Sequence, residues 1–229
     1  MQGKVVLVTG AKGGLGTYVT QAFLAAGARV AGVSRSIKQA DFPHANFFAV
    51  AGELTDSQSA ATMVNSVLQK FGRLDALAHL IGGFGAGKPV HETDDATFEK
   101  MADMNFRSAF YTLKAVVPAL RRAGGGRIVG IGSKAAVEPA AGVAVYSASK
   151  AALITLVRTV ALENKDAGIT ANVLLPGTID TPANRAAMPG ADVSKWVNPE
   201  KLASLIVWLA GDAASEVSGA VIPVYGRDI

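Results

Sequence analysis

Tyr146 and Lys150 lie four residues apart in a segment of helical period, a spacing that suits proton transfer at an oxygen atom. Residues i and i+4 share one face of a helix, about 5–6 Å apart at Cβ. A free tyrosine has a pKa of about 10, and a neighbouring ammonium favours the phenolate and lowers that pKa. Tyr146 is therefore a candidate to exchange a proton with a carbonyl oxygen. An exposed helix pair would show the same spacing, so the pair needs support from its context.

Two further polar residues give that context. Ser133 follows the apolar run Arg127–Ile131, and in a parallel sheet the residues after a strand lie where ligands bind. Its hydroxyl can donate a hydrogen bond to the same carbonyl oxygen. Asn105 is a candidate to orient a water or a backbone group in a proton relay. We predict a catalytic group of Ser133, Tyr146, Lys150 and Asn105.

A glycine-rich loop, GAKGGLG at residues 10–16, follows the first apolar run of the chain. Glycines let the backbone turn sharply and approach a phosphate closely, and a helix amino terminus supplies free N–H groups to an anion. An ordinary strand-to-helix turn can also use glycine, but the position before the first helix favours a dinucleotide. The loop residues predicted to contact the cofactor are Gly10, Lys12, Gly13, Gly14, Leu15 and Gly16.

The residues after the second apolar run, Ser34-Arg35-Ser36, bear on the choice of cofactor. A carboxylate there would hold the adenosine ribose hydroxyls of NAD(H). The chain has an arginine instead, which can bind a 2′-phosphate, and Lys12 offers a second positive charge. The sequence therefore predicts NADP(H) in preference to NAD(H). The alternative interpretation is that Arg35 is a solvated loop residue.

Apolar runs alternate with segments of helical period along the whole chain, and near-continuous runs are typical of strands covered on both faces. The expected strands are Lys4–Thr9, Arg29–Val33, Asn46–Ala51, Leu74–Leu80, Arg127–Ile131, Ile169–Leu175 and Ala220–Val224. The expected helices are Gly14–Ala26, Asp56–Phe71, Asp95–Arg122, Tyr146–Asp166 and Asn198–Ala210. This alternation predicts a single α/β domain, residues 1–229, with a doubly wound parallel sheet and helices on both faces.

Composition narrows the classes of function. The 229 residues are 50% apolar and 17% charged and include no cysteine, which excludes a disordered chain, a disulfide scaffold and a cysteine nucleophile. With three histidines we expect no metal site. The net charge is +4, but the basic residues are scattered, so we expect no nucleic-acid partner. The amino terminus lacks a leader pattern and no window approaches about 18 unbroken apolar residues. We therefore expect a soluble, cytoplasmic protein without a membrane partner.

The motifs together resemble the short-chain dehydrogenase/reductase family. They are Thr9-Gly10-x-x-x-Gly14-x-Gly16, the serine after the fifth strand, Tyr146-x-x-x-Lys150 and Pro176-Gly177-x-x-x-Thr181, in the family's order along the whole chain. The resemblance implies a Rossmann-type domain with a seven-stranded parallel sheet, a nicotinamide cofactor, and a homodimer or homotetramer built on the two long helices.

The resemblance also implies roles for individual residues. Tyr146 would be the acid–base, Lys150 would hold the nicotinamide ribose and tune Tyr146, Ser133 would polarise the substrate and Asn105 would support the proton relay. Ile179 and Thr181 would contact the nicotinamide carboxamide. The other predicted cofactor contacts are Ser34, Arg35, Ser36, Glu53, Leu54, Gly82, Pro176 and Gly177.

Some segments depart from the family's usual pattern. His79-Leu80-Ile81-Gly82 stands where the family has Asn-Asn-Ala-Gly, and we expect His79 to be a near-core residue. The segment Gly82–Gly87 and the stretch after the sixth strand resemble the dihydropteridine reductases of the family. Residues 178–196 are the predicted substrate loop, and Phe84 and Trp196 can present aromatic faces to a flat heterocycle.

Three functions are consistent with these residues. The first is an NADP(H)-dependent oxidoreductase that moves hydride between nicotinamide C4 and a carbonyl or alcohol substrate, with tyrosine as acid–base. The second is a dihydropteridine-reductase-like enzyme that reduces a quinonoid dihydropterin. The third is a non-catalytic dinucleotide-sensing protein, which would have no need for Ser133, Tyr146 and Lys150 together.

Overall fold

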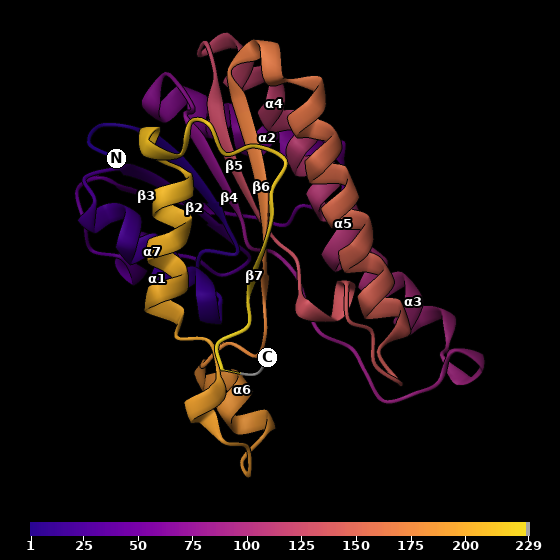
Figure 1. Ribbon diagram of the computed structural model, residues 1–229. Coiled ribbons are helices and arrows are strands. Elements are labelled where there is room, and N and C mark those ends of the chain that lie inside the picture. Colours follow the sequence, from indigo (N-terminus) through magenta and orange to yellow (C-terminus); the bar gives the residue numbers. More distant parts are fainter. Residues whose placement is uncertain (228–229) are drawn as a thin grey trace.

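One parallel sheet organises the fold, which a computed structural model describes for residues 1–227 (Figure 1). Asp228 and Ile229, part of the predicted domain, lie outside the described residues. Within them seven strands pair in the order β3-β2-β1-β4-β5-β6-β7, all in parallel. The strands are β1 (Val5–Thr9), β2 (Arg29–Ser34), β3 (Phe47–Ala51), β4 (Ala76–His79), β5 (Gly126–Ile131), β6 (Ile169–Pro176) and β7 (Val221–Val224). The strand order reverses between β1 and β4, which is where such sheets bind ligands.

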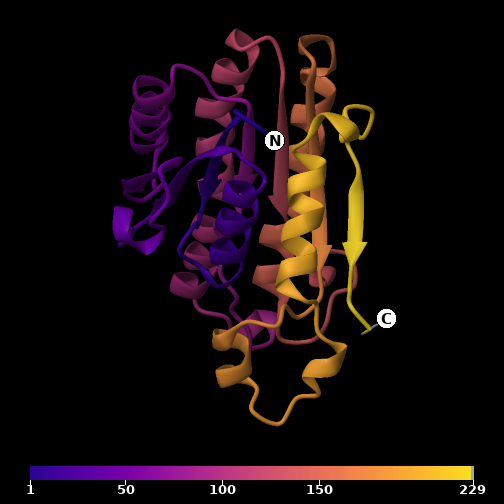
Figure 2. The ribbon, with the colours of Figure 1, turned by 90° about the vertical axis from the view of Figure 1, so that its left-hand side faces the viewer.

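Helices cover both faces of the sheet, as the sequence predicts (Figure 1). Helices α1 (Gly14–Ala25) and α7 (Pro199–Leu209) lie on one face. Helices α2 (Ser57–Phe71), α4 (Ser108–Arg122) and α5 (Ala144–Glu163) lie on the other. The short helix α6 (Pro182–Ala187) lies beyond the carboxyl ends of the strands, at the bottom of Figures 1 and 2. The predicted doubly wound α/β fold is confirmed.

The strands are buried because successive side chains enter two separate cores. In β1, Val5 and Leu7 belong to the core under α2, α4 and α5, whereas Val6 and Val8 belong to the core under α1 and α7. All five residues of β1 and all eight of β6 are buried. Both faces of a central parallel strand are covered, so its apolar run is continuous rather than alternating.

The segment predicted as one helix from Asp95 to Arg122 is divided. An α-helix, α3 (Asp95–Ala102), leads into a π-helical turn at Asp103–Arg107, and α4 follows. The N–H of Ser108 donates to the carbonyl oxygen of Asp103, five residues back. Such turns are frequent at functional sites, and this one contains Asn105. The chain therefore stays helical, but with one locally widened turn.

Helix α5 begins at Ala144, two residues before the predicted start at Tyr146. The helix is long and apolar enough by composition to cross a membrane, with a mean hydropathy of 1.3 and 44% of that window buried. In this fold its buried side packs on the sheet, as expected of the core helix of an α/β domain.

Candidate active site

The loop after β1 carries the predicted dinucleotide-binding glycines. Gly10 has a φ of +72°, which favours glycine, and its carbonyl oxygen accepts from the N–H of Gly13 at 2.8 Å. A Cβ on Gly16 would overlap that same carbonyl, and a Cβ on Gly14 would lie 3.1 Å from Thr181 Cγ2. The loop therefore folds tightly only with these glycines.

The start of α1 has the properties that a pyrophosphate requires. No side chain caps the helix at Gly13, and its first turn carries no acidic residue. The first N–H groups of the helix are thus left for an anion, and the glycines keep side chains out of its path. These residues fit a dinucleotide cofactor at the position that the sequence predicts.

The carboxyl edge of β6 borders the same loop. Thr181, 6% exposed, packs against Gly14, and its hydroxyl caps α6 by accepting from the N–H of Asn184 at 3.3 Å. Pro176 is the buried last residue of β6, and Gly177 packs against the backbone of Tyr225. Of the predicted contacts here, Thr181 lies directly against the glycine loop.

The predicted substrate loop, residues 178–196, is pinned at its two ends. Asp180 N–H donates to Val197 O at 2.9 Å, and Val197 N–H donates to Thr178 O at 2.8 Å. Ile179 forms the bridge with Val197 between these bonds. Within the loop, Arg185 pairs with Asp180, and this ion pair lowers the pKa of Asp180. The loop therefore projects from a closed base at the end of the sheet.

The part of the site that is predicted to bind the adenosine end of the cofactor contains the two predicted phosphate-binding cations, and both of them face a carboxylate. The Lys12 ammonium lies 2.9 Å from Asp41 Oδ1 and donates to Ser36 O at 3.3 Å. Arg35 Nε lies 3.7 Å from Glu53 Oε1. Sequence reasoning missed Asp41, which lies in a 3-10 turn at Gln39–Asp41 beyond β2.

Two other residues that are predicted to contact the cofactor here, Ser34 and Leu54, use their side chains differently. Ser34 Oγ accepts from the N–H of Lys12 at 3.1 Å, which ties the end of β2 to the glycine loop. The side chain of Leu54 is 6% exposed and belongs to the core under α2, α4 and α5. Its apolar side chain is used for packing, which is the more favourable place for it.

The predicted catalytic residues come together at the ends of β4 and β5. Ser133, 9% exposed, follows β5, and its oxygen accepts from the N–H of Ala135 at 3.2 Å. The Tyr146 hydroxyl lies close enough to Ser133 for the serine side chain to lower the pKa of the phenol. The Lys150 ammonium is buried and donates to Ile131 O at 2.8 Å. The structure therefore brings a serine, a phenol and an ammonium to one edge of the sheet.

The electrostatics of this group differ from the expectation for Tyr146. Burial raises the pKa of Tyr146, and the neighbouring Ser133 side chain opposes that rise only in part. Burial also lowers the pKa of Lys150, to about 8. The expected lowering of the phenol pKa by Lys150 is wrong for this structure, because the ammonium is directed to the carbonyl at the end of β5 and desolvation dominates.

Asn105 holds the loop after β4 against this group. Its Oδ1 accepts from the N–H of Gly83 at 3.0 Å, and its Nδ2 donates to Gly83 O at 3.0 Å and to Ser149 Oγ at 3.1 Å. A Cβ on Gly82 would lie 2.8 Å from both Asn105 Oδ1 and Lys150 Nζ. Asn105 thus orients a backbone group, and glycine at position 82 lets the loop pack onto Lys150.

His79 lies at the end of β4, behind the catalytic group. It is 3% exposed, and its Nδ1 lies 3.0 Å from Thr9 Oγ1, which also accepts from the N–H of Leu80. Its Nε2 has no hydrogen-bond partner in the described part of the chain. Burial, assisted by the positive charge of Lys150, lowers the pKa of His79 to about 3. The histidine is therefore a neutral, near-core residue that links β1 to β4.

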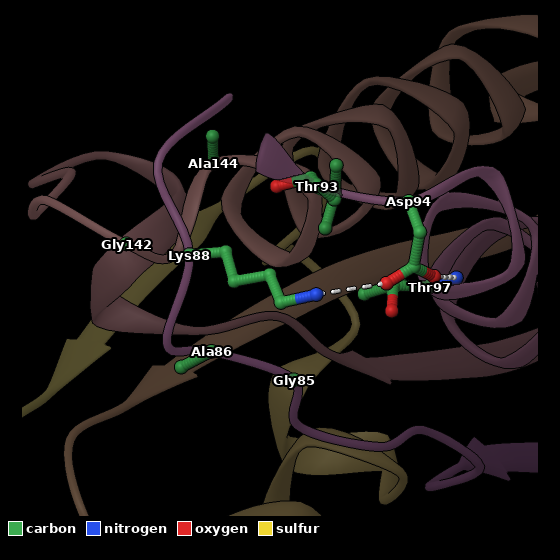
Figure 3. Close-up of a pocket in the computed structure, with 9 residues that line it drawn as sticks. Gly85, Ala86, Lys88, Thr93, Asp94, Thr97, Gly142 and Ala144 are labelled. Atoms are coloured by element: carbon green, nitrogen blue, oxygen red, sulfur yellow. Dashed lines mark hydrogen bonds and ion pairs between the residues drawn. The ribbon is translucent and has the colours of Figure 1, made fainter. Parts of the chain in front are cut away.

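An exposed aromatic side chain and a small cavity flank the catalytic group. Phe84 is 68% exposed, and its ring meets that of Tyr146 edge-on at a centroid distance of 5.0 Å. Behind its loop, a cavity of about 170 Å³ is lined by residues that include Lys88 and Asp94 (Figure 3). Asp94 accepts from Lys88 Nζ at 3.3 Å and from the N–H of Thr97 at 2.8 Å. The rim thus combines an apolar wall with a polar recess.

Known proteins share this arrangement. The family model for short chain dehydrogenases matches residues 4–191. The 3-oxoacyl-[acyl-carrier-protein] reductase FabG of Salmonella typhimurium is 31% identical, over 98% of this chain and 97% of its own length. The solved structure of ElxO with NADP bound is 25% identical with a TM-score of 0.92, over 98% of each chain. A 3-ketoacyl-(acyl-carrier-protein) reductase from Brucella melitensis, complexed with NADH, is 25% identical with a TM-score of 0.87, over 100% of this chain and 99% of its own.

The doubly wound sheet, the glycine loop at its switch point and these relatives define a nicotinamide-dependent oxidoreductase. The chain belongs to the short-chain dehydrogenase/reductase family.

Proposed function

We propose that this protein is an NADP(H)-dependent oxidoreductase that moves hydride between nicotinamide C4 and a carbonyl or alcohol substrate, with Tyr146 as the acid–base. The observation that carries the proposal is that Ser133, Tyr146 and the buried Lys150 come together at one edge of the sheet, with the Lys150 ammonium on the carbonyl at the end of β5. A sensing protein that only binds the dinucleotide has no use for this group.

The residues that would hold the cofactor are those of the glycine loop, the adenosine end and the end of β6. The first N–H groups of α1 would bind the pyrophosphate, and Thr181 would contact the carboxamide end. Lys150 would hold the nicotinamide ribose. When bound, the reduced nicotinamide supplies the hydride.

Ser133 and Tyr146 would act on the substrate oxygen. Ser133 Oγ accepts from the N–H of Ala135, and its hydroxyl would donate its proton to a carbonyl oxygen of the substrate. The raised pKa of Tyr146 keeps its phenol protonated near pH 7, which is the state that a proton donor needs in the direction of reduction. Asn105 would support this step as a positioning residue, through Gly83.

The preference for NADP(H) is supported by the two cations at the adenosine end, Lys12 and Arg35, and by the lack of a carboxylate at the end of β2. Both cations have carboxylate partners, so a 2′-phosphate would have to compete with Asp41 and Glu53. The preference for NADP(H) over NAD(H) is therefore expected to be modest rather than absolute.

The decisive variant is Tyr146→Phe, assayed by NADPH oxidation with a panel of ketones and a quinonoid dihydropterin. We expect turnover to fall by about 10²- to 10⁴-fold, because the proton donor is lost. Nucleotide binding, measured by calorimetry, stays intact. Tyr111→Phe on α4, at a ring that packs against Phe110, is the matched control. Unchanged turnover in Tyr146→Phe on a working substrate would exclude the proposal.

The pterin alternative is not favoured, because two of the relatives reported above are named as 3-oxoacyl- or 3-ketoacyl-[acyl-carrier-protein] reductases and none is named as a pterin reductase. The homo-oligomer and the cytoplasmic location stay predictions. Exposed apolar side chains on the two long helices, Phe110 at 43% and Leu162 at 73%, support an oligomer built on α4 and α5. Sedimentation of the purified protein tests this, and a monomer would contradict it.

A further inference from the structure

The Lys12–Asp41 ion pair is the better defined of the two at the adenosine end. Its atoms are 2.9 Å apart, and the side chains retain 41% and 25% of their exposure. The Arg35–Glu53 pair is longer, at 3.7 Å, and its side chains are 80% and 56% exposed. Exposed pairs are held weakly, so Asp41 is the carboxylate with the firmer hold on a predicted phosphate-binding cation.

Asp41 is fixed by contacts that do not involve Lys12. Its second oxygen, Oδ2, accepts from the N–H of Lys38 at 2.8 Å. In the same turn, Gln39 Nε2 donates to Phe47 O at 2.8 Å, and its Oε1 accepts from the N–H of Ala49 at 3.2 Å. The turn is thereby fastened to β3, so the carboxylate is presented to Lys12 by the fold rather than by a chance approach of two flexible side chains.

Lys12 is tied to the predicted ribose contacts on both sides. Its N–H donates to Ser34 Oγ, and its ammonium donates to Ser36 O, the residues that flank Arg35. A group that binds at this end between Ser34 and Ser36 is therefore within reach of Lys12, and the same ammonium already has an anion as its partner. This arrangement makes the carboxylate a competitor of any phosphate there.

We propose that Asp41 is a specificity-determining residue, a fixed counter-charge that competes with the cofactor's 2′-phosphate for Lys12 and so limits the preference for NADP(H) over NAD(H). The proposal rests on the proposed function, because it requires the 2′-phosphate to bind at Lys12 and Arg35.

The sign follows from the charges at this end. Lys12 and Arg35 contribute two positive charges, and Asp41 and Glu53 contribute two negative ones, so the four sum to zero. Two anions that share one ammonium lie roughly 5–6 Å apart. At that distance in water, their repulsion lowers the affinity for the second anion by about threefold per unit charge. A phosphate monoester carries about −1.5 to −2 charges. Neutralising Asp41 is thus expected to favour the phosphate by about three- to tenfold at low salt.

The experiment is calorimetric titration of the protein with 2′,5′-ADP and with 5′-AMP, which differ only in the 2′-phosphate. The variant is Asp41→Asn, whose side-chain oxygen can still accept from Lys38. We expect 2′,5′-ADP to bind to the variant three- to tenfold more tightly than to wild type at low salt, with the affinity for 5′-AMP changed less than twofold. At 0.5 M salt the gain is expected to shrink, because screening weakens the repulsion.

The matched control is Asp94→Asn. Asp94 also pairs with a lysine and accepts from a backbone N–H, but it borders the cavity near α3 (Figure 3). It is expected to leave both affinities unchanged. If Asp41→Asn binds 2′,5′-ADP as wild type does, or more weakly, the inference is overturned, because Asp41 would then merely position Lys12.

A third variant, Lys12→Ala, distinguishes failure of the role proposed for Asp41 from failure of the predicted preference for NADP(H). If it weakens 2′,5′-ADP selectively while Asp41→Asn has no effect, the phosphate site stands and only the role of Asp41 is wrong. If Lys12→Ala and Arg35→Ala both leave 2′,5′-ADP unaffected, the predicted preference for NADP(H) is wrong and the role of Asp41 is overturned with it.

Discussion

Burial of the Lys150 ammonium makes the stability of this protein depend on pH in a defined window. Lys150 is 4% exposed, and desolvation lowers its pKa from 10.5 to about 8. Below pH 8 the folded protein carries the cost of a buried charge, and this cost is relieved as the pH rises towards 10.5, since the folded state then binds fewer protons than the unfolded state. Stability therefore increases with pH across this window, relative to a variant without the lysine.

The variant Lys150→Met isolates this effect, because methionine has a similar length and no charge. At about 1.4 kcal/mol per pH unit, we expect wild type to gain about 2 kcal/mol of unfolding free energy over Lys150→Met between pH 7 and pH 9.5. The measurement is urea unfolding of both proteins without nucleotide at several pH values, followed by tryptophan fluorescence.

Lys201→Met is the matched control, since Lys201 is exposed on α7. Its stability is expected to follow that of wild type at every pH. If the curves of wild type and Lys150→Met run parallel from pH 7 to pH 9.5, the lysine is not desolvated in the folded state and the reasoning is refuted.

Three other variants test neighbouring parts of the site. Asn105→Ala removes three hydrogen bonds to Gly83 and Ser149 and is expected to cost about 2–4 kcal/mol in urea unfolding, and a loss below 1 kcal/mol would contradict this. Gly16→Ala forces a Cβ onto the Gly10 carbonyl and is expected to abolish 5′-ADP binding, measured by calorimetry. Gly190→Ala, where a Cβ meets nothing within 4 Å, is the control and is expected to bind 5′-ADP normally. Equal binding by both variants would contradict the tight packing of the glycine loop. His79→Asn is expected to lose less stability in acid than wild type, because His79 has a pKa of about 3 in the folded state and only the unfolded state takes up its proton below pH 6.5. Between pH 7 and pH 4.5 we expect the unfolding free energy of the variant to gain about 2–3 kcal/mol relative to wild type, and no gain would contradict this.

The strands and most helices could be predicted from the sequence because their signals are local. The run Val5–Thr9 is apolar on both faces and is buried on both faces. Helix α2 begins within one residue of its predicted start, because the Asp56 side chain accepts from the N–H of Ser59 and so caps the amino terminus of the helix. The spacing of Tyr146 and Lys150 also indicated correctly that both belong to α5.

The errors concern contacts between distant segments. The spacing of Tyr146 and Lys150 does not reveal that the Lys150 ammonium donates to Ile131 O, 19 residues earlier in the chain. The sequence therefore predicts a lowered phenol pKa, whereas the pKa of Tyr146 is raised. Asp41 was missed because its approach to Lys12, 29 residues away, depends on how the turn after β2 folds onto β3. Leu54 lies next to the predicted Glu53 contact, but only burial shows that its side chain belongs to the core.

The π-helical turn at Asp103–Arg107 fixes the helical phase on its two sides. An α-helix advances 100° about its axis with every residue, so the widened turn offsets α3 from α4 by roughly one residue of rotation. Deleting a single residue there would restore an unbroken helix and swing α3 about 100° around the axis of α4. The amide of Asn105 would then no longer reach Gly83. The number of residues between α3 and α4 is thus as strictly specified for this site as the identity of its side chains.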